Sequence, residues 1–184
     1  MGNEISLRIK RCKGPGFASY WEEFRVPYYP KMNVVSALME IQMNPVNAKG
    51  EVTTPVAWDC NCLEEVCGAC TMLINGKVRQ SCSALVDGLK QPIRLEPLTK
   101  FPLVCDLVVD RKVMFENLRK VKAWIEIDGT HHMGPGPKIP QKTQEYCYEL
   151  SKCMTCGCCM EACPNVSHKS KFIGPAAIAQ VDLI

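Results

Sequence analysis

The sequence predicts an α+β chain in two parts, a small mixed sheet packed on one helix and then a helical, cysteine-rich part. Apolar and polar residues alternate over 4–10 and again over 93–96, which is the period of half-buried strands. Over 110–124 the apolar residues instead recur every three or four positions, as on an amphipathic helix. Glycine and proline then crowd residues 128–137, so we expect the crossing between the two parts there.

The elements of the first part follow in order along the chain. The strand over 4–10 turns at Gly14-Pro15-Gly16 and is expected to return as a partner strand over 21–26. Asn33 is placed to cap the helix that follows it. Asn75-Gly76 favours a tight hairpin because both residues tolerate positive φ.

The second part is predicted to be helical. A short helix over 143–150 precedes a run of cysteines, and Gly174-Pro175 starts another helix, since proline suits the first turn. That last helix has an apolar face with no cap and no glycine stop before Ile184. We therefore expect the chain to be truncated at its C-terminus, and the reading frame to continue past Ile184 with another cysteine-proline run.

Composition narrows the class of protein. Thirteen of the 184 residues are cysteine, and the N-terminus has no secretory signal, so reduced thiols or metal ligands are expected rather than disulfides. A formal charge of +3 is too small, and too scattered along the chain, to indicate nucleic acid binding. The apolar runs fall far short of the roughly 20 residues that cross a bilayer. Any membrane attachment must therefore be through a partner.

Four cysteines form a first motif with the spacing C-x4-C-x2-C-x11-C: Cys62, Cys67, Cys70 and Cys82. The first three match the plant-type arrangement for a [2Fe-2S] cluster. Gly68 and Ala69 permit the loop to wrap closely, so that backbone N–H groups can face the sulfides. Cys82 is expected to arrive from the far strand of the Asn75-Gly76 hairpin.

Zinc is the alternative metal for this motif, although zinc sites usually pair two separated C-x2-C knuckles and this motif contains only one. Cys60 lies two residues before Cys62 and could in principle replace it. Its spacing to Cys67 fits the pattern less well, so we interpret Cys60 as a neighbouring thiol.

A second motif, C-x2-C-x2-C-x3-C-P, is formed by Cys153, Cys156, Cys159, Cys163 and Pro164. In the bacterial ferredoxin run with this spacing, three cysteines bind one [4Fe-4S] cluster and the fourth serves another cluster. A second copy of the run normally supplies the missing ligands, and the 184 residues hold none.

The remaining cysteines and the histidines fit neither ligand set. Free cysteine is commonly a small buried apolar residue, and we interpret in this way Cys12, Cys105, Cys147 and Cys158. Loop positions rather than ligation are expected for His131, His132 and His168. Four basic residues flank the motifs and either offset cluster charge or form plain solvated surface: Lys77, Arg79, Lys169 and Lys171.

The two motifs in this order resemble the iron-sulfur subunit of succinate dehydrogenase and fumarate reductase. The resemblance spans nearly the whole chain. Within that family, the chain is similar to the type found in menaquinone-using Gram-positive bacteria. It is carried by three stretches: Asp59-Cys60-Asn61-Cys62-Leu63-Glu64-Glu65-Val66-Cys67-Gly68-Ala69-Cys70, Arg79-Gln80-Ser81-Cys82 and Leu150-Ser151-Lys152-Cys153-Met154-Thr155-Cys156-Gly157.

The resemblance implies a β-grasp [2Fe-2S] ferredoxin domain over 1–105, a helix and Gly/Pro-rich connection over 106–140, and the first part of a helical ferredoxin domain over 141–184. By that resemblance the first motif holds [2Fe-2S], Cys153, Cys156 and Cys159 supply three ligands of [4Fe-4S], and Cys163 binds [3Fe-4S]. The family's remaining ligands lie in a C-terminal stretch that this sequence lacks. Ubiquinone-using relatives carry tryptophan soon after the cysteine-proline pair, whereas Pro164 here leads into Asn165-Val166-Ser167-His168.

The implied function is electron transfer between a flavoprotein that interconverts succinate and fumarate and a membrane quinone, with no bond chemistry on this chain. The implied partners are the FAD-containing flavoprotein subunit, a cytochrome b-type membrane anchor and quinone, at the cytoplasmic face of the cell membrane. Two alternatives are a free-standing soluble ferredoxin and a zinc-stabilised interaction module.

Overall fold

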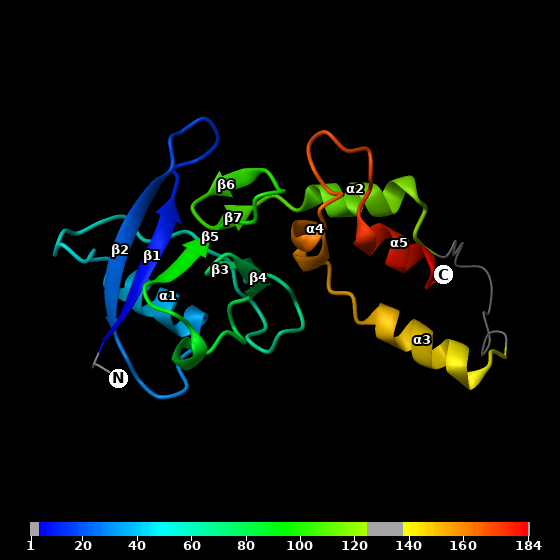
Figure 1. Cartoon of the computed structure of the whole chain (residues 1–184), viewed down its shortest axis with the longest axis horizontal. Coiled ribbons are helices and arrows are strands. Elements are labelled where there is room, and N and C mark those ends of the chain that lie inside the picture. Colours follow the sequence, from blue (N-terminus) through cyan, green and yellow to red (C-terminus); the bar gives the residue numbers. More distant parts are fainter. Residues whose placement is uncertain (1–3, 125–137, 184) are drawn as a thin grey trace, which may run out of the picture.

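The computed structural model describes residues 4–124 and 138–183, and it divides into a sheet half and a helical half that lie side by side (Figure 1). The sheet half contains every strand. The helical half contains α2, α4 and α5 packed together, with α3 extending along their outer side. The two cysteine motifs lie on opposite sides of the junction between the halves.

The main sheet has five strands in the order β2-β1-β5-β3-β4. Its strands are β1 (Glu4–Arg11), β2 (Tyr20–Pro27), β3 (Thr71–Ile74), β4 (Lys77–Gln80) and β5 (Ile93–Glu96). Strands β1 and β5 are parallel and the other pairs are antiparallel, so the sheet is mixed as predicted. The alternation that predicted β1 places Ile5, Leu7 and Ile9 on the buried face, each at most 3% exposed.

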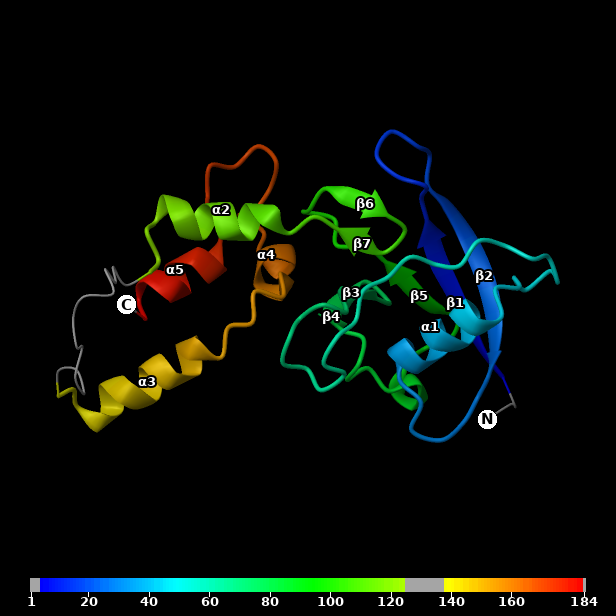
Figure 2. The ribbon, with the colours of Figure 1, turned by 180° about the vertical axis from the view of Figure 1, so that it is seen from behind.

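Helix α1 (Val34–Met43) lies across the buried face of this sheet (Figure 2). The Asn33 side chain caps the helix by accepting a hydrogen bond from the Ser36 amide at 2.8 Å, as the sequence predicted. Burying the apolar face of α1 against the strands completes the first core. That core therefore forms entirely from residues 5–107.

A two-stranded ribbon, β6 (Leu103–Cys105) and β7 (Val108–Val109), is joined to the main sheet by buried charge. Arg11 pairs with Glu22 and, at 3.0 Å, with Asp106, and Arg11 is only 3% exposed. The second Asp106 oxygen accepts the Ala57 amide at 2.9 Å. This network ties the first strand to the segment that leads into the first cysteine loop.

The helical half consists of α2 (Lys112–Lys120), α3 (Gln141–Ser151), α4 (Cys158–Ala162) and α5 (Pro175–Val181). Proline occupies the first turn of α5, as expected. Helix α2 is shorter than the amphipathic stretch predicted over 110–124, because its hydrogen-bonded turns end at Lys120. Its buried residues are Met114 and the polar Asn117.

A second apolar cluster joins the two halves. It contains Leu98 and Phe101 from the sheet half and Met114, Met160, Val166 and Ala176 from the helical half. Helix α2, which the predicted boundaries assign to the connection, thus packs with α4 and α5. The predicted crossing over 128–137 lies outside the described residues, and the domain boundaries stay a prediction. No helix of the described part has the length and apolarity needed to span a bilayer.

Candidate functional site

The loop of the first motif surrounds its own sulfur atoms with backbone N–H groups. The amides of Glu64 and Val66 donate to Cys62 Sγ, and the amide of Ala69 donates to Cys67 Sγ, all at 3.4 Å. The amides turn inward because the chain repeatedly enters the left-handed region, with positive φ at Leu63 (62°), Glu65 (61°) and Gly68 (70°). Such donors stabilise negative charge on sulfur, which a thiolate ligand requires.

The four thiols of this motif lie together as two pairs. Cys62 lies within hydrogen-bonding reach of Cys67, and Cys82 within hydrogen-bonding reach of Cys70. The two backbone donors lower the pKa of Cys62 to about 7, whereas burial raises the pKa of Cys82 to about 11. Cys70 and Cys82 are buried, and Cys62 and Cys67 lie nearer the surface. The structure thus brings together the four residues that spacing selected.

Secondary structure positions the buried pair. Cys70 directly precedes β3, and Cys82 lies just after β4 ends at Gln80 rather than on the strand itself. The Asn33 amide group donates to the Cys82 carbonyl at 2.8 Å, and the Ser81 amide donates to the Cys70 carbonyl at 3.2 Å. The residue that caps α1 therefore also holds the last cysteine of the motif.

The second run divides its cysteines between two places. Cys153, Cys156 and Cys159 are near enough for the charges of the first two to act on the third, whose pKa is raised first by burial. Cys163 instead packs against the apolar cluster between the halves. The division of these cysteines between two clusters stays a prediction.

Two neighbours lower the pKa of Cys156 to about 6: the Cys158 thiol donates to it, and the Arg111 guanidinium adds positive charge. The Cys158 pKa is raised because its thiol is engaged in that hydrogen bond and is half-buried. Cys158 was predicted to be a small buried apolar residue, yet it directly contacts Cys156, a predicted ligand.

The two cysteine loops touch each other at Gly68 and Cys156. A Cβ atom placed on Gly68 would lie 2.5 Å from Cys156 Cβ and 2.7 Å from its Cα, too close for any side chain. Arg111 donates from Nη1 to the carbonyls of Gly68 (2.6 Å) and Cys156 (3.2 Å), and from Nη2 to the Ala69 carbonyl (3.1 Å). Sequence reasoning missed Arg111, because it is one of several basic residues around α2 and has no distinguishing spacing.

The other singled-out residues lie outside these contacts. The Cys12 thiol is buried and donates to the carbonyls of Gly14 and Phe17, which suits a structural residue. Cys60 is exposed, and its pKa is raised by slight burial and by the charge of Cys67. Exposed positions are also taken by Lys77, Arg79, His168, Lys169 and Lys171. His131 and His132 lie outside the described residues.

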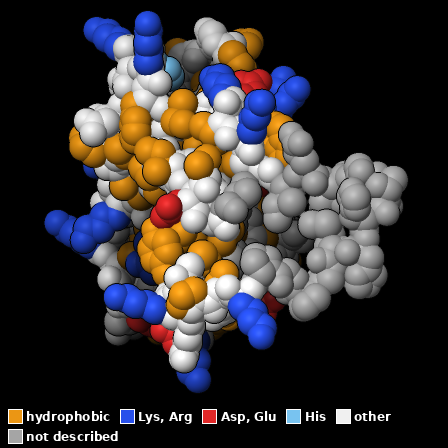
Figure 3. Space-filling model, turned by 90° about the vertical axis from the view of Figure 1, so that its right-hand side faces the viewer, with side chains coloured by type: hydrophobic (Ala, Val, Ile, Leu, Met, Phe, Trp, Pro, Cys, Tyr) orange, Lys and Arg blue, Asp and Glu red, His pale blue; other side chains and the backbone are white. Residues whose placement is uncertain are grey.

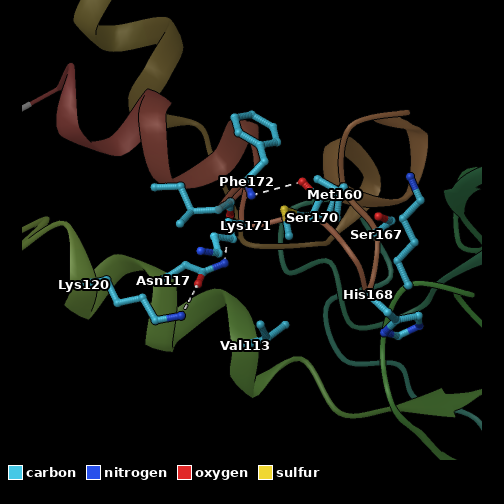
Figure 4. Close-up of a pocket in the computed structure, with 12 residues that line it drawn as sticks. Val113, Asn117, Lys120, Met160, Ser167, His168, Ser170, Lys171 and Phe172 are labelled. Carbon is cyan, nitrogen blue, oxygen red and sulfur yellow. Dashed lines mark hydrogen bonds between the residues drawn. The ribbon is translucent and has the colours of Figure 1, made fainter.

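A cavity of about 290 Å³ opens beside the second run, between α2 and the segment after Cys163 (Figure 4). Asn117 lines the cavity, where it accepts a hydrogen bond from Lys120 Nζ at 3.2 Å and donates one to the Ile173 carbonyl at 2.8 Å. His168 lies at its rim. The cavity lies between α2 and the last loop, and none of the first three cysteines of the second run lines it.

Among residues 4–124 and 138–183, no three His, Cys, Asp or Glu side chains surround one point as ligands of a single metal ion would. The thiols of the first motif are instead arranged in pairs.

Fold and thiol arrangement together define a ferredoxin-type protein. A family model described as a 2Fe-2S iron-sulfur cluster binding domain matches residues 6–116. The succinate dehydrogenase iron-sulfur subunit of Bacillus subtilis is 68% identical over 179 residues, which are 97% of this chain and 71% of that protein. The fumarate reductase iron-sulfur subunit of Haemophilus influenzae is 30% identical over 167 residues, covering 84% of this chain and 62% of the relative.

The chain belongs to the family of succinate dehydrogenase and fumarate reductase iron-sulfur subunits. A chain in the structure of the Mycobacterium smegmatis Sdh1 complex in the apo form has the same fold, with a TM-score of 0.81 at 23% identity, and the match covers all of this chain and 76% of that one. The predicted α+β ferredoxin fold, the predicted family and its electron-transfer function are confirmed.

Proposed function

We propose that this subunit receives electrons from a flavoprotein that interconverts succinate and fumarate and passes them to a membrane quinone through three iron-sulfur clusters. Family membership supports the electron-transfer role. The finer assignment of clusters to residues rests on the contacts of the thiols. The paired arrangement of the first four thiols is the single observation that carries it.

The first motif fits a [2Fe-2S] cluster. Each iron of such a cluster takes two thiolates and two bridging sulfides, so the protein must offer four thiolates as two pairs. The pairs Cys62 with Cys67 and Cys70 with Cys82 meet this requirement. Inward amides at Glu64, Val66 and Ala69 supply the hydrogen bonds that stabilise anionic sulfur.

The second run fits a different centre. We assign Cys153, Cys156 and Cys159 to three positions of a [4Fe-4S] cluster, because their side chains interact while Cys163 packs elsewhere. Cys163 is then left for the [3Fe-4S] cluster. The two motifs supply no further ligands for either cluster.

When bound, the clusters supply one-electron oxidation and reduction without moving a proton or a bond. The residues of this chain hold the sulfur ligands, exclude water from Cys70 and Cys82, and direct amides at sulfur. Burial, hydrogen bonds and local charge set the potentials of such centres.

Partner surfaces are offered by the helical half. Figure 3 shows apolar side chains gathered on that end of the molecule, with Lys and Arg among them. The exposed large apolar residues of this half include Tyr146, Tyr148, Phe172, Ile178 and Val181. Exposed apolar patches of this kind commonly mark interaction sites. We propose that the chain binds an FAD-containing flavoprotein and a cytochrome b-type anchor, peripheral to the cytoplasmic face of the membrane.

Cluster assignment is tested on anaerobically purified protein by iron and acid-labile sulfide content and by electron paramagnetic resonance. Cys70→Ser is expected to remove the [2Fe-2S] signal and Cys156→Ser the [4Fe-4S] signal. The control Cys12→Ser, outside both motifs, should keep both. Wild-type protein that contains zinc without iron or sulfide would overturn the proposal.

The partner assignment is tested separately by purifying the tagged subunit from membranes. A flavoprotein with bound FAD and a haem-containing anchor should copurify, and the complex should reduce a quinone with succinate. A subunit recovered alone, with an intact [2Fe-2S] signal, would support the free-standing ferredoxin instead.

A further inference from the structure

The two cysteine loops are in direct contact at their junction, which is formed by Gly68 and Cys156. Gly68 has φ +70° and leaves no room for a Cβ against Cys156. The backbone of Gly68 therefore lies directly against Cys156 at the point where the two proposed clusters are held. A displacement of either loop would change the separation of the clusters directly.

Arg111 spans this junction. Its guanidinium donates to two carbonyls of the first loop and to one carbonyl of the second. The planar fork of arginine can satisfy three acceptors in fixed directions, whereas the ammonium of lysine acts as a point charge on a flexible stem. The side chain thus joins the loops and determines their relative orientation.

The base of Arg111 is itself anchored. It is the residue that immediately precedes α2, and that helix is held by buried Met114 and Asn117. Asn117 donates to the Ile173 carbonyl at 2.8 Å, which links α2 to the segment before α5. The guanidinium is therefore presented by a packed helix rather than by a mobile loop.

Two further contacts cross the junction beside Arg111. Gln80 Nε2 donates to Met154 Sδ at 3.1 Å, so the residue before Ser81-Cys82 contacts the residue after Cys153. The Thr71 hydroxyl, at the start of β3, lies beside the Cys158 thiol and donates its proton to the Gly68 carbonyl at 2.8 Å. Neither contact carries charge, whereas Arg111 places a positive charge between the loops.

We propose that Arg111 is a positioning residue for electron transfer, one that holds the two cluster loops at a fixed separation. Its positive charge also favours the reduced form of the clusters on either side of the junction. The inference rests on the proposed cluster assignment. One electron leaves the first cluster, which is oxidised, and enters the second, which is reduced. No proton or group moves in this step. A fixed positive charge favours the reduced, more negative form of a nearby cluster.

Two substitutions separate the geometric role from the electrostatic one. Arg111→Lys keeps the charge and loses the fork, whereas Arg111→Gln loses both. Arg119→Gln is the matched control, because it removes an exposed arginine from the same helix, distant from the loops. All three are made in the full-length subunit within its purified complex, and iron and sulfide content is measured first.

The readouts are the midpoint potentials of the two clusters and the magnetic interaction between them when both are reduced, measured by electron paramagnetic resonance. We expect Arg111→Gln to make the [4Fe-4S] midpoint potential more negative by about 59 mV, which corresponds to a tenfold change in the one-electron equilibrium constant. The magnetic interaction should weaken as well. Arg111→Lys should retain the potential but weaken the interaction, and Arg119→Gln should change neither.

The inference is overturned if Arg111→Gln, with full cluster content, keeps the wild-type potential and interaction. If that variant loses a cluster, Arg111→Lys decides, because an unchanged interaction in it excludes the positioning role. Failure of the cluster assignment has a different signature, since the wild-type complex would then lack one of the two signals.

Discussion

The two cysteine motifs differ in what holds them in place. The first loop is positioned mainly by its own backbone, by β3 and by the cap of α1, all within the sheet half, and it also accepts two hydrogen bonds from Arg111. The second run has a five-residue helix, α4, and its neighbours depend on Gly68, Arg111 and the apolar cluster shared with the sheet half. We therefore expect the first site to form without the second, and the second to require a folded sheet half.

This difference makes the structure hierarchical. A change that unfolds the sheet half should remove both sites, and a change at the junction should remove only the second. A change at one anchor of the first loop should leave the second intact. Each cluster can be followed separately by electron paramagnetic resonance in anaerobic protein.

Arg11→Met should have the largest effect. It leaves Glu22 and Asp106 without their buried cation, which should lower the free energy of unfolding by about 3–5 kcal/mol. Both cluster signals should fall together, and urea unfolding followed by circular dichroism measures the loss of stability. The control Arg25→Met, at an exposed position of β2, should stay within about 0.5 kcal/mol of wild type. A selective loss of the second cluster in Arg11→Met would contradict the hierarchy.

Gly68→Ala should separate the two sites. Its Cβ would collide with Cys156 at 2.5 Å, and alanine also resists the positive φ. We expect a cost of about 2–5 kcal/mol, together with loss of the second cluster. Gly76→Ala is the matched control because it has a similar φ of +78° with nothing within 4 Å, so only the conformational cost of about 1–2 kcal/mol remains. Equal losses in the two variants would show that the contact between the loops is unimportant.

Glu161→Ala tests the other attachment of α4. The Glu161 carboxylate accepts the amides of Thr99 at 2.9 Å and Lys100 at 3.1 Å, and also the Thr99 hydroxyl. Loss of these charge-assisted hydrogen bonds should cost about 1.5–3 kcal/mol and lower the occupancy of the second cluster, measured as iron per protein. The first signal should be unchanged. Glu149→Ala, at an exposed ion pair on α3, should have almost no effect.

Asn33→Ala should have the smallest effect, and on the first site. It removes the cap of α1, which costs about 1 kcal/mol, and also the hydrogen bond to the Cys82 carbonyl. Asn33→Asp keeps an acceptor for the Ser36 amide but lacks the donor to Cys82, so it should retain most of the stability. If both variants lower the temperature at which the [2Fe-2S] absorbance is lost, the bond to Cys82 matters. If only Asn33→Ala does so, the cap alone accounts for the effect.

Local sequence patterns correctly predicted several elements of this fold. Alternation predicted β1, Asn33 predicted the start of α1, and Pro175 predicted the first turn of α5. Each of these signals depends on backbone preferences of nearby residues. The end of α2 was less well predicted, because apolar residues continue past Lys120 whereas the hydrogen-bonded turns do not.

The sequence by itself predicted which thiols form each set, since ligand spacing is a local property of a loop. How the two sets are held together was decided only by the tertiary structure. Gly68, Arg111 and Cys156 are distant in sequence, and they meet because Met114 and Met160 bury their side chains against Leu98 and Phe101. Contacts that arise from the packing of separate elements leave no periodic mark on the chain.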